Sequence, residues 1–369
     1  MTQHHDIAVI GGGLLGGAIG YGLASRGLKV VMLDEDDVAF RAARGNFGLV
    51  WVQSKGAAYR PYHLWSREAS SLWPEFAREL HDVGGIDVAP QFDGGFTFCY
   101  SEAEFKARAE LMHHQFDDDL PLPGAYSMMD RDELLRLIPI IGPNVVGASY
   151  CKLDGCANPL RLLRALHASF RRVGGEHKPA HPVETITPRA NGFEIRTQNG
   201  TTLSADKVVL TAGLGNAKLA PMVGLQTPVS PIRGQMLVTE KCAPLLPRVT
   251  HIIRQTDEGG VLIGDSQETA GMDDDTKLGV LGDIAARAVN AFPILGTLRI
   301  VRTWSCLRVM TPDGVPLYQH SIQHPGAFAF SVHSGVTLAS VHARRIAGAV
   351  ASGTLPEKLH PFNEARLAV

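Results

Sequence analysis

The chain has 369 residues, of which 45% are hydrophobic and 20% charged, with a formal net charge of −2, so it is long enough for two interleaved domains with separate cores. The balanced charge, without basic runs, argues against nucleic-acid binding, and no stretch approaches the roughly 18 uninterrupted apolar residues of a transmembrane segment. The first six residues carry no signal pattern, and the 5 cysteines and 15 histidines lack metal-ligand spacing, so we expect a cytoplasmic protein with reduced thiols and no metal site.

The first predicted unit is a strand, a glycine-rich turn and a helix. Residues 7–10 form a short apolar run typical of a buried parallel strand. Gly11, Gly13 and Gly16 follow at the spacing G-x-G-x-x-G, which permits a tight turn, close approach of a pyrophosphate and close packing of a helix on the strand. The helix predicted over residues 14–25 points its free N–H groups and positive dipole end at that phosphate. This unit therefore predicts dinucleotide binding.

An acidic residue completes this fingerprint. Residues 29–33 predict a second strand, and Asp34 stands at its end, where a carboxylate accepts hydrogen bonds from a ribose 2′-OH. A 2′-phosphorylated cofactor is disfavoured, because its charge would meet that of Asp34. A glycine-rich turn alone also occurs in proteins without a ligand there, but the complete set of strand, glycines, helix, second strand and acid indicates a dinucleotide site.

The segment from Arg41 to Gly48 is predicted to be a loop. Gly45, Asn46 and Gly48 give it backbone freedom, and Arg44 adds a second positive charge to that of Arg41. Such a loop can fold over an extended dinucleotide and touch it with main-chain groups. The alternative interpretation is an ordinary surface turn.

Further helices and strands follow along the chain. The remaining helices are predicted over residues 64–80, 102–116, 131–137, 281–292 and 336–351, with one more that begins at Pro159 after the N-cap Asn158. Further strands are predicted over residues 94–100, 147–150, 183–186, 192–197, 207–210, 228–239, 252–263, 298–307 and 327–332. Two of these strands run into glycine turns that end at Gly213 and Gly335. We therefore expect a nucleotide domain built from pieces far apart in the sequence.

Several motifs in this order resemble the flavin-dependent D-amino-acid oxidase superfamily over essentially the whole chain. They are the N-terminal fingerprint and the segments RAARGNFG, VVLTAG, RGQMLVT, RTWSCLRVMTPDGVPLY and SVHSGVTLA. Within the superfamily, GNFGLVWVQSKG and the run from IRQTDEGGVLIGDSQE are most similar to the β subunits of bacterial opine oxidases. The hydrogen cyanide synthase flavoprotein subunit and the β subunits of dye-linked proline and D-hydroxyproline dehydrogenases are also similar.

The resemblance implies an α/β fold, α+β overall, with non-covalently bound FAD. A Rossmann-like parallel-sheet FAD domain is expected from residues 1–85, 145–225 and 312–369, and a largely antiparallel-sheet substrate domain from residues 86–144 and 226–311. The FAD contacts implied are Gly11, Gly13, Leu14, Leu15, Gly16, Asp34 and Glu35 at the pyrophosphate and adenosine ribose; Arg41, Ala42, Arg44, Gly45, Asn46, Gly48 and Leu49 along the flavin; Val183 at the adenine; Thr211, Ala212 and Gly213 on the pyrophosphate side; and Gly335, Val336 and Thr337 at the pyrimidine edge. A helix N-terminus at this last group is suited to the anion of reduced flavin.

The chemistry of the family oxidises an amine, with hydride transfer to flavin N5 and hydrolysis of the resulting imine. A substrate carboxylate calls for a fixed arginine. Arg308 matches the carboxylate-binding arginine of the glycine oxidase motif, although Val309 stands where that motif usually has proline. A surface arginine in an ion pair is the alternative interpretation, and Arg302 and Arg254 are secondary candidates. A guanidino-bearing substrate would call for a carboxylate, which the sequence does not identify.

Three other positions bear on the reaction. The resemblance places His333 near the flavin, where it positions or deprotonates the substrate amine, or merely caps the following helix. Leu262 stands where monomeric sarcosine oxidase carries an oxygen-activating lysine, which favours a dehydrogenase. Cys306 matches that enzyme's covalently flavinylated cysteine, but we expect an ordinary buried thiol.

We therefore predict an FAD-dependent dehydrogenase that oxidises a carboxylate-bearing secondary amine, an opine such as octopine or nopaline. The similar subunits work in hetero-oligomers, and because this chain lacks cysteine spacing for an iron–sulfur cluster, FMN or [2Fe-2S] centres are expected at or in partner subunits. The alternatives are a D-hydroxyproline or proline dehydrogenase β subunit, a glycine or sarcosine oxidase-like enzyme, and a non-catalytic subunit that holds FAD as a scaffold.

Overall fold

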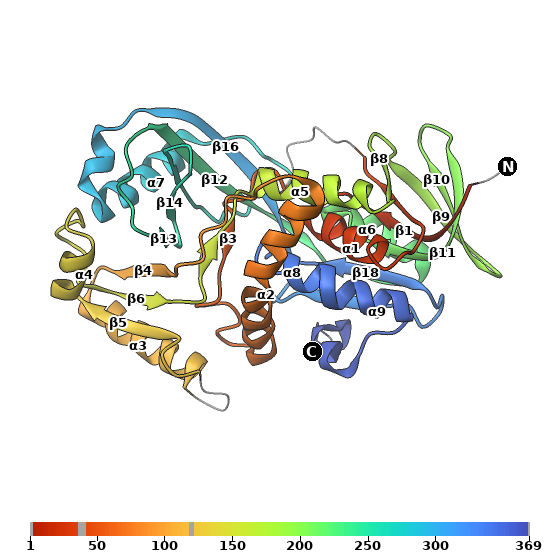
Figure 1. The fold of residues 1–369 in the computed structure, drawn as a ribbon, viewed down its shortest axis with the longest axis horizontal. Helices are drawn as coiled ribbons and strands as arrows, with labels where there is room; N and C mark the ends of the chain where they lie inside the picture. The colour runs from red at the N-terminus through yellow and green to blue at the C-terminus, as the bar shows by residue number, and fades with distance from the viewer. Residues whose placement is uncertain (1–2, 36–41, 118–121, 368–369) are drawn as a thin grey trace.

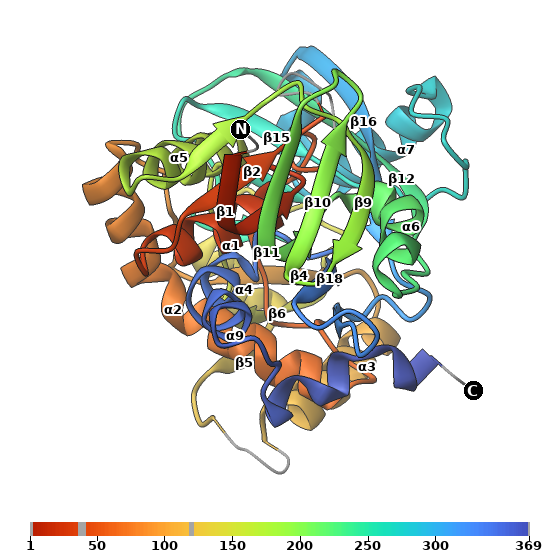
Figure 2. The ribbon, with the colours of Figure 1, turned by 90° about the vertical axis from the view of Figure 1, so that its right-hand side faces the viewer.

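The computed structural model describes residues 3–35, 42–117 and 122–367. Its largest sheet has eight strands and carries the N-terminal fingerprint. Strands β17, β18, β11, β1, β2 and β8 lie side by side in this order, and the hairpin of β9 and β10 pairs with β11 (Figures 1 and 2). Their bounds are β1 Gln3–Ile10, β2 Val30–Leu33, β8 Glu176–Lys178, β9 Val183–Arg189, β10 Gly192–Thr197, β11 Thr202–Leu210, β17 Leu317–His320 and β18 Ala327–Ser331.

The central strands of this sheet are parallel, as the sequence predicts. β1 runs parallel to both β2 and β11, and β11 runs parallel to β18. Side chains of β1 alternate between two buried faces: Ile7 and Val9 pack with the helices, whereas Ala8 and Ile10 pack with the β9–β10 hairpin. Burial on both faces explains why residues 7–10 are continuously apolar.

Helices cover one face of the large sheet (Figure 1). They are α1 Leu14–Ala24, α2 Arg60–Gly84, α5 Pro159–Arg172, α8 Ala339–Val341 and α9 Ala347–Ser352. The helix predicted over residues 336–351 is interrupted: residues 335–338 form a turn, and a π-helical turn, His342–Ile346, separates α8 from α9. This turn packs tightly on α1, because a Cβ atom at Gly22 would collide with the carbonyl oxygen of Ala343. A short helix, α6 Asn216–Leu219, follows β11.

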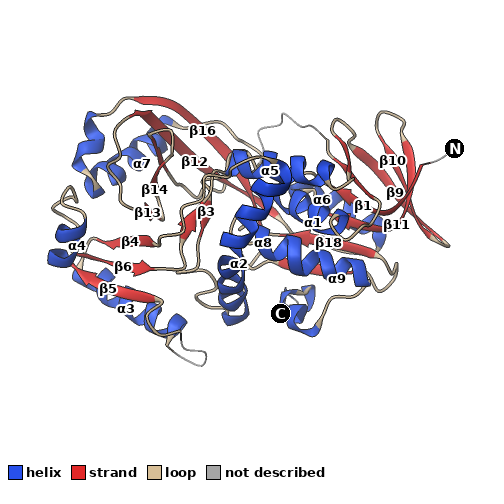
Figure 3. Ribbon diagram, viewed as in Figure 1, coloured by secondary structure: helices blue, strands red, loops and turns tan. Residues whose placement is uncertain are grey.

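The second region contains two four-stranded sheets and three helices (Figure 3). One sheet has the order β14-β15-β12-β16 and the other β13-β4-β6-β5. The bounds are β4 Gly95–Cys99, β5 Tyr126–Asp130, β6 Gly147–Cys151, β12 Ser230–Lys241, β13 Val249–Thr250, β14 Ile253–Gln255, β15 Gly260–Ile263, β16 Ile300–Met310, α3 Glu102–Phe116, α4 Arg131–Leu137 and α7 Leu278–Ala291. Pairing in the first sheet is antiparallel throughout. A short pair, β3 Leu49–Val50 with β7 Gly155–Cys156, completes the strands described.

The strand pairing corrects two sequence predictions. β6 lies after residue 145, where the FAD domain was predicted to resume, yet it pairs with β4 and β5 of the second region. Hydrogen bonding across strands decides this membership, and the local sequence does not record it. The strand predicted over residues 252–263 is two strands, β14 and β15, because the chain turns at Gly259, which has a φ of +96°.

No helix within the described ranges combines the length and the apolar character needed to cross a bilayer.

Replacing the N-cap of α5 tests the local account of this helix. The Asn158 side chain accepts hydrogen bonds from the backbone N–H groups of Leu160 and Arg161. Asn158→Ala is expected to lower the free energy of unfolding by about 1 kcal/mol, measured by urea denaturation. As the control, Asn144→Ala removes a surface amide that bonds Asn290 but caps no helix. Equal losses in the two variants would contradict the capping role.

Candidate functional site

The β1–α1 turn forms a cradle that has no room for side chains on its inner side. Gly11 has a φ of +103°, and a Cβ atom there would collide with the backbone of Thr211. A Cβ atom at Gly16 would collide with the carbonyl oxygen of Gly11. At Gly13 the space is open, since the nearest atom to an added Cβ would be the Cβ of Ala43 at 3.8 Å. Among the three glycines of the motif, the backbone is thus accessible at Gly13, where the sequence predicts close approach of a pyrophosphate.

Helix α1 begins at this open position. Gly13 is its N-cap, with no side-chain cap, and the first turn contains no acidic residue. The first N–H groups of the helix therefore point, with the positive dipole end, at the open space. The uncapped N-terminus of α1 therefore suits an anionic group.

A cavity of about 560 Å³ extends from this turn. Most of the predicted FAD-binding residues line it: Gly11, Gly13, Leu14, Leu15, Asp34, Glu35, Ala42, Arg44, Asn46, Val183, Thr211, Ala212, Gly213 and Gly335. They come from the three strand-to-glycine turns after β1, β11 and β18, the start of α1, the end of β2, the 42–46 loop and β9. A dinucleotide needs such an elongated site with backbone donors at its middle, so the residues present fit FAD.

Asp34 is fixed at the wall of this cavity. Its carboxylate Oδ2 accepts a hydrogen bond from the backbone N–H of Gly12, and the residue is buried. The ring Nε2 of His167 contacts the carbonyl oxygen of the same glycine at 2.6 Å. These contacts hold the acid beside the turn, where the fingerprint predicts a ribose.

The other predicted cofactor residues support the wall without lining the cavity. Gly16 packs α1 on the turn, and Gly45 accepts a hydrogen bond from Trp304 Nε1 at 3.3 Å. Gly48 donates its N–H to Asn46 Oδ1 at 2.7 Å. The remaining three are Leu49, which pairs with β7, and Val336 and Thr337, which are buried in the turn after β18. Arg41 lies outside the described residues.

Residues 51–62, which comprise the segment between β3 and α2 and the first residues of α2, are bound at both ends to the turn after β18. Trp51 donates its backbone N–H to Thr337 Oγ1 at 3.1 Å, and the hydroxyls of Tyr62 and Ser334 are 2.6 Å apart. The segment therefore lies alongside His333, which lines the cavity. The pKa of His333 is held well below the usual histidine range, first by burial and then by the positive charges of Lys55 and Arg308. Its ring is consequently neutral near pH 7.

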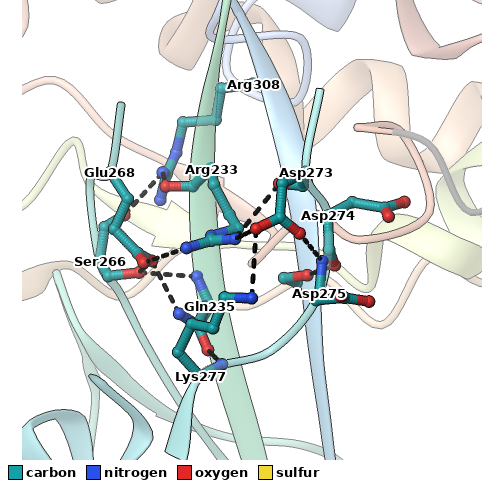
Figure 4. Close-up of polar contacts among 10 residues, drawn as sticks. Arg233, Gln235, Ser266, Glu268, Asp273, Asp274, Asp275, Lys277 and Arg308 are labelled. Carbon is teal, nitrogen blue, oxygen red and sulfur yellow. Dashed lines mark hydrogen bonds and ion pairs between the residues drawn. The ribbon is translucent and has the colours of Figure 1, made fainter. Parts of the chain in front are cut away.

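Arg308 is not a surface arginine, because its side chain is only 14% exposed. Its Nη2 pairs with Asp265 at 2.8 Å. Its Nη1 donates to the carbonyl oxygens of Ser266 at 2.7 Å and Arg233 at 3.3 Å, and Figure 4 shows Arg308 beside these two residues. Arg308 itself does not line the cavity that extends from the glycine turn, but its charge acts on both His333 and Lys55. The guanidinium is thus held in one orientation, close enough to His333 for its charge to act on that ring.

A second arginine fixes the segment that follows Asp265. Arg233 of β12 pairs with Glu268 and with Asp273, each at 2.7 Å (Figure 4). Gln235 Nε2 donates to Glu268 at 2.8 Å, and the backbone N–H of Lys277 donates to Gln235 Oε1 at 2.7 Å. These bonds attach residues 266–277 to β12, which explains why Asp265 and Ser266 are in place to hold Arg308.

The two secondary arginine candidates lie elsewhere. Arg254 is buried, and its Nε donates to the carbonyl oxygen of Phe47 at 2.6 Å, so it fixes the 45–48 loop. Arg302 lies at the exposed start of β16, six residues before Arg308, and does not line the cavity. The structure therefore brings Arg308 and His333 together and separates Arg302 from both.

Sequence reasoning missed two residues of this neighbourhood, Lys55 and Asp265. Lys55 stands in the segment GLVWVQSKG, and Asp265 directly follows the GGVLIG segment. A lone lysine or aspartate in a loop carries no periodicity or spacing that marks a function. Only the folded chain shows that both face Arg308.

Three comparisons place this fold and site among known proteins. A model of the family "FAD dependent oxidoreductase" matches residues 6–349. The chain is 45% identical over 366 residues to the opine oxidase B subunit of Agrobacterium tumefaciens (strain Ach5), covering 98% of this chain and 97% of that protein. It is 42% identical over 361 residues to the corresponding protein of Rhizobium meliloti, with 98% and 97% covered. The crystal structure of glycine oxidase from Geobacillus kaustophilus superposes with a TM-score of 0.89 at 24% identity, covering 98% of both chains, which shows the shared fold.

Adding one methyl group in the cradle tests whether it holds the cofactor. Gly13→Ala projects a Cβ atom into the open space and is expected to weaken FAD binding about tenfold or more, measured by titrating the apoprotein with FAD. Gly20→Ala is the matched control, since its Cβ atom would make only ordinary contacts, 3.6 Å from Phe170 and 3.8 Å from Met32. Unchanged FAD affinity in Gly13→Ala would show that the dinucleotide lies elsewhere.

Proposed function

The chain belongs to the FAD dependent oxidoreductase family, and we propose that it oxidises the C–N bond of an opine, a carboxylate-bearing secondary amine such as octopine or nopaline. The observation that carries this proposal is the similarity to two opine oxidase B subunits over nearly the whole length of both chains. The products are an amino acid and a 2-oxo acid.

FAD supplies the acceptor for the hydride that leaves the substrate carbon. We assign the pyrophosphate to the glycine turn and the N-terminus of α1, the adenosine ribose to Asp34, the adenine to Val183, and the pyrimidine edge to the turn that begins at Gly335. We propose that the cofactor is held without a covalent bond. Burial raises the pKa of the Cys306 thiol, which disfavours the thiolate that attachment would need.

Arg308 and His333 act on the substrate in this proposal. The guanidinium of Arg308, oriented by Asp265 and two carbonyl oxygens, binds a substrate carboxylate. The neutral ring of His333 accepts a hydrogen bond from the substrate amine and so orients it, and the amine must be unprotonated when it is oxidised. Because the pKa of His333 is lowered, its ring stays neutral even at a pH somewhat below the usual histidine range. Protonation of the substrate amine, and not of His333, is therefore expected to cause the loss of activity at low pH.

We propose that electrons leave this chain through a partner subunit, so that it works as a dehydrogenase in a hetero-oligomer. Its similarity to proteins named as B subunits supports this, and FMN or [2Fe-2S] centres would lie at or in the partners. Leu262 is buried in β15 and provides no cation. Lys55, however, lies beside His333, and oxygen consumption by the isolated chain tests whether this cation supports oxidase activity.

Removing the Arg308 charge tests the proposed reaction. Arg308→Met loses a charge-assisted hydrogen bond worth about 1.5–3 kcal/mol, so kcat/KM for octopine is expected to fall about 10- to 150-fold. Anaerobic stopped-flow reduction of the bound flavin measures this directly. Arg299→Met is the control, since Arg299 lies exposed just before β16 and pairs with Glu240 at 3.3 Å. Wild-type reduction rates in Arg308→Met would overturn the assignment of substrate binding to this arginine.

A further inference from the structure

Lys55 lies on a segment whose backbone is fixed on the substrate side of His333. Its N–H donates to the carbonyl oxygen of Val52 at 3.0 Å, and its own carbonyl oxygen accepts from Gln115 Nε2 at 2.9 Å. The same glutamine accepts the N–H of Ser54 at 3.0 Å. With both ends of residues 51–62 bonded to the turn after β18, Lys55 has a defined place beside that turn.

The ammonium group of Lys55 makes no stabilising contact with the described part of the chain. Among the described ranges of the chain, its Nζ makes no hydrogen bond or ion pair, although the side chain is partly buried. Arg308, in contrast, is anchored by three polar contacts. The charge of Lys55 is therefore available to a ligand, since no group of the fold neutralises it through a direct contact.

The charges around Lys55 leave an excess of positive charge. It faces Arg308 of β16, Asp265 after β15, Asp154 in the turn between β6 and β7, and His333 after β18. Asp265 is already paired with Arg308, and His333 is neutral. Asp154 is fully buried, and its carboxylate accepts hydrogen bonds from the backbone N–H groups of Val52 and Gln53. Burial raises the pKa of Asp154 to about 7. Lys55 and Arg308 therefore face one carboxylate, Asp265, that is already paired and a second, Asp154, that is only partly ionised near pH 7, so positive charge is in excess.

A substrate with two carboxylates restores the balance. The reductive condensation product of an amino acid and a 2-oxo acid carries one carboxylate on each side of its secondary amine, whereas glycine, sarcosine and proline carry a single carboxylate. We propose that Lys55 binds the second carboxylate of such a dicarboxylate amine while Arg308 binds the first. This assignment rests on the proposed function and gives the specificity of the site for dicarboxylate over monocarboxylate amines.

A pair of sulfur analogues tests the proposal without turnover. Thiodiacetate carries two carboxylates and (methylthio)acetate one, and neither contains an amine to be oxidised. Their dissociation constants are measured from the change in flavin absorbance of the FAD-loaded chain. Lys55→Met is expected to weaken thiodiacetate binding about 10- to 100-fold and to leave (methylthio)acetate within about twofold, as loss of one charge-assisted contact requires.

Two further variants make the result specific. Lys55→Arg keeps the charge and is expected to retain the preference for thiodiacetate, and Lys106→Met, a change at an exposed position of α3, is expected to alter neither constant. Burial and Arg308 lower the pKa of Lys55 to about 8. Thiodiacetate binding should therefore weaken as the pH rises from 7 to 9 in the wild type, because Lys55 loses its charge, but not in Lys55→Arg.

The outcomes separate this proposal from the function on which it rests. Equal weakening of both analogues by Lys55→Met, or no weakening of either, would overturn the role of Lys55. If the selective loss occurs but no opine reduces the flavin of the wild type, the dicarboxylate site stands and the opine assignment fails. A loss confined to the rate of flavin reduction, with both dissociation constants unchanged, would instead make Lys55 a proton acceptor and contradict the proposal.

Discussion

The cofactor site depends on how closely the β1–α1 turn approaches the backbone of Thr211. The Thr211 hydroxyl donates to the carbonyl oxygens of Ile10 at 3.0 Å and Gly11 at 2.9 Å, and any side chain at Gly11 would collide there. Because β1 and β11 are parallel neighbours, this contact joins two glycine turns that are distant in sequence. β18 on the other side of β11 adds the third turn, and the dinucleotide cavity opens along all three.

The substrate side depends on a charge balance. Asp265 and backbone carbonyls orient Arg308, and the 266–277 segment that supplies them is itself held by Arg233 on β12. His333 stays neutral between the cavity and these cations. In the proposed function, this fixed positive charge binds a carboxylate and the uncharged ring accepts a hydrogen bond from an amine, which are the two requirements of amino-acid oxidation at a flavin.

Local signals predicted much of this fold. α3 begins at Glu102, as predicted, because Ser101 caps it through the N–H of Glu104, and α5 begins at Pro159 because Asn158 caps it. The fingerprint also predicted the glycine turn and Asp34 at the cavity wall, and the family resemblance implied further residues that line the cavity. Three features could not be predicted from the sequence, because residues far away in the chain decide them. They are the pairing of β6 with β4, the hydrogen bond from Arg254 to Phe47, and the positions of Lys55 and Asp265 close to Arg308.

The central claim is that this chain itself oxidises an opine. The most direct measurement is anaerobic incubation of the FAD-loaded chain with octopine, following flavin bleaching and quantifying arginine and pyruvate together. We expect rapid bleaching with arginine and pyruvate formed in equal amounts, each equal to the flavin reduced. A flavin that stays oxidised with octopine and nopaline, or that proline or glycine alone reduces, would contradict the claim.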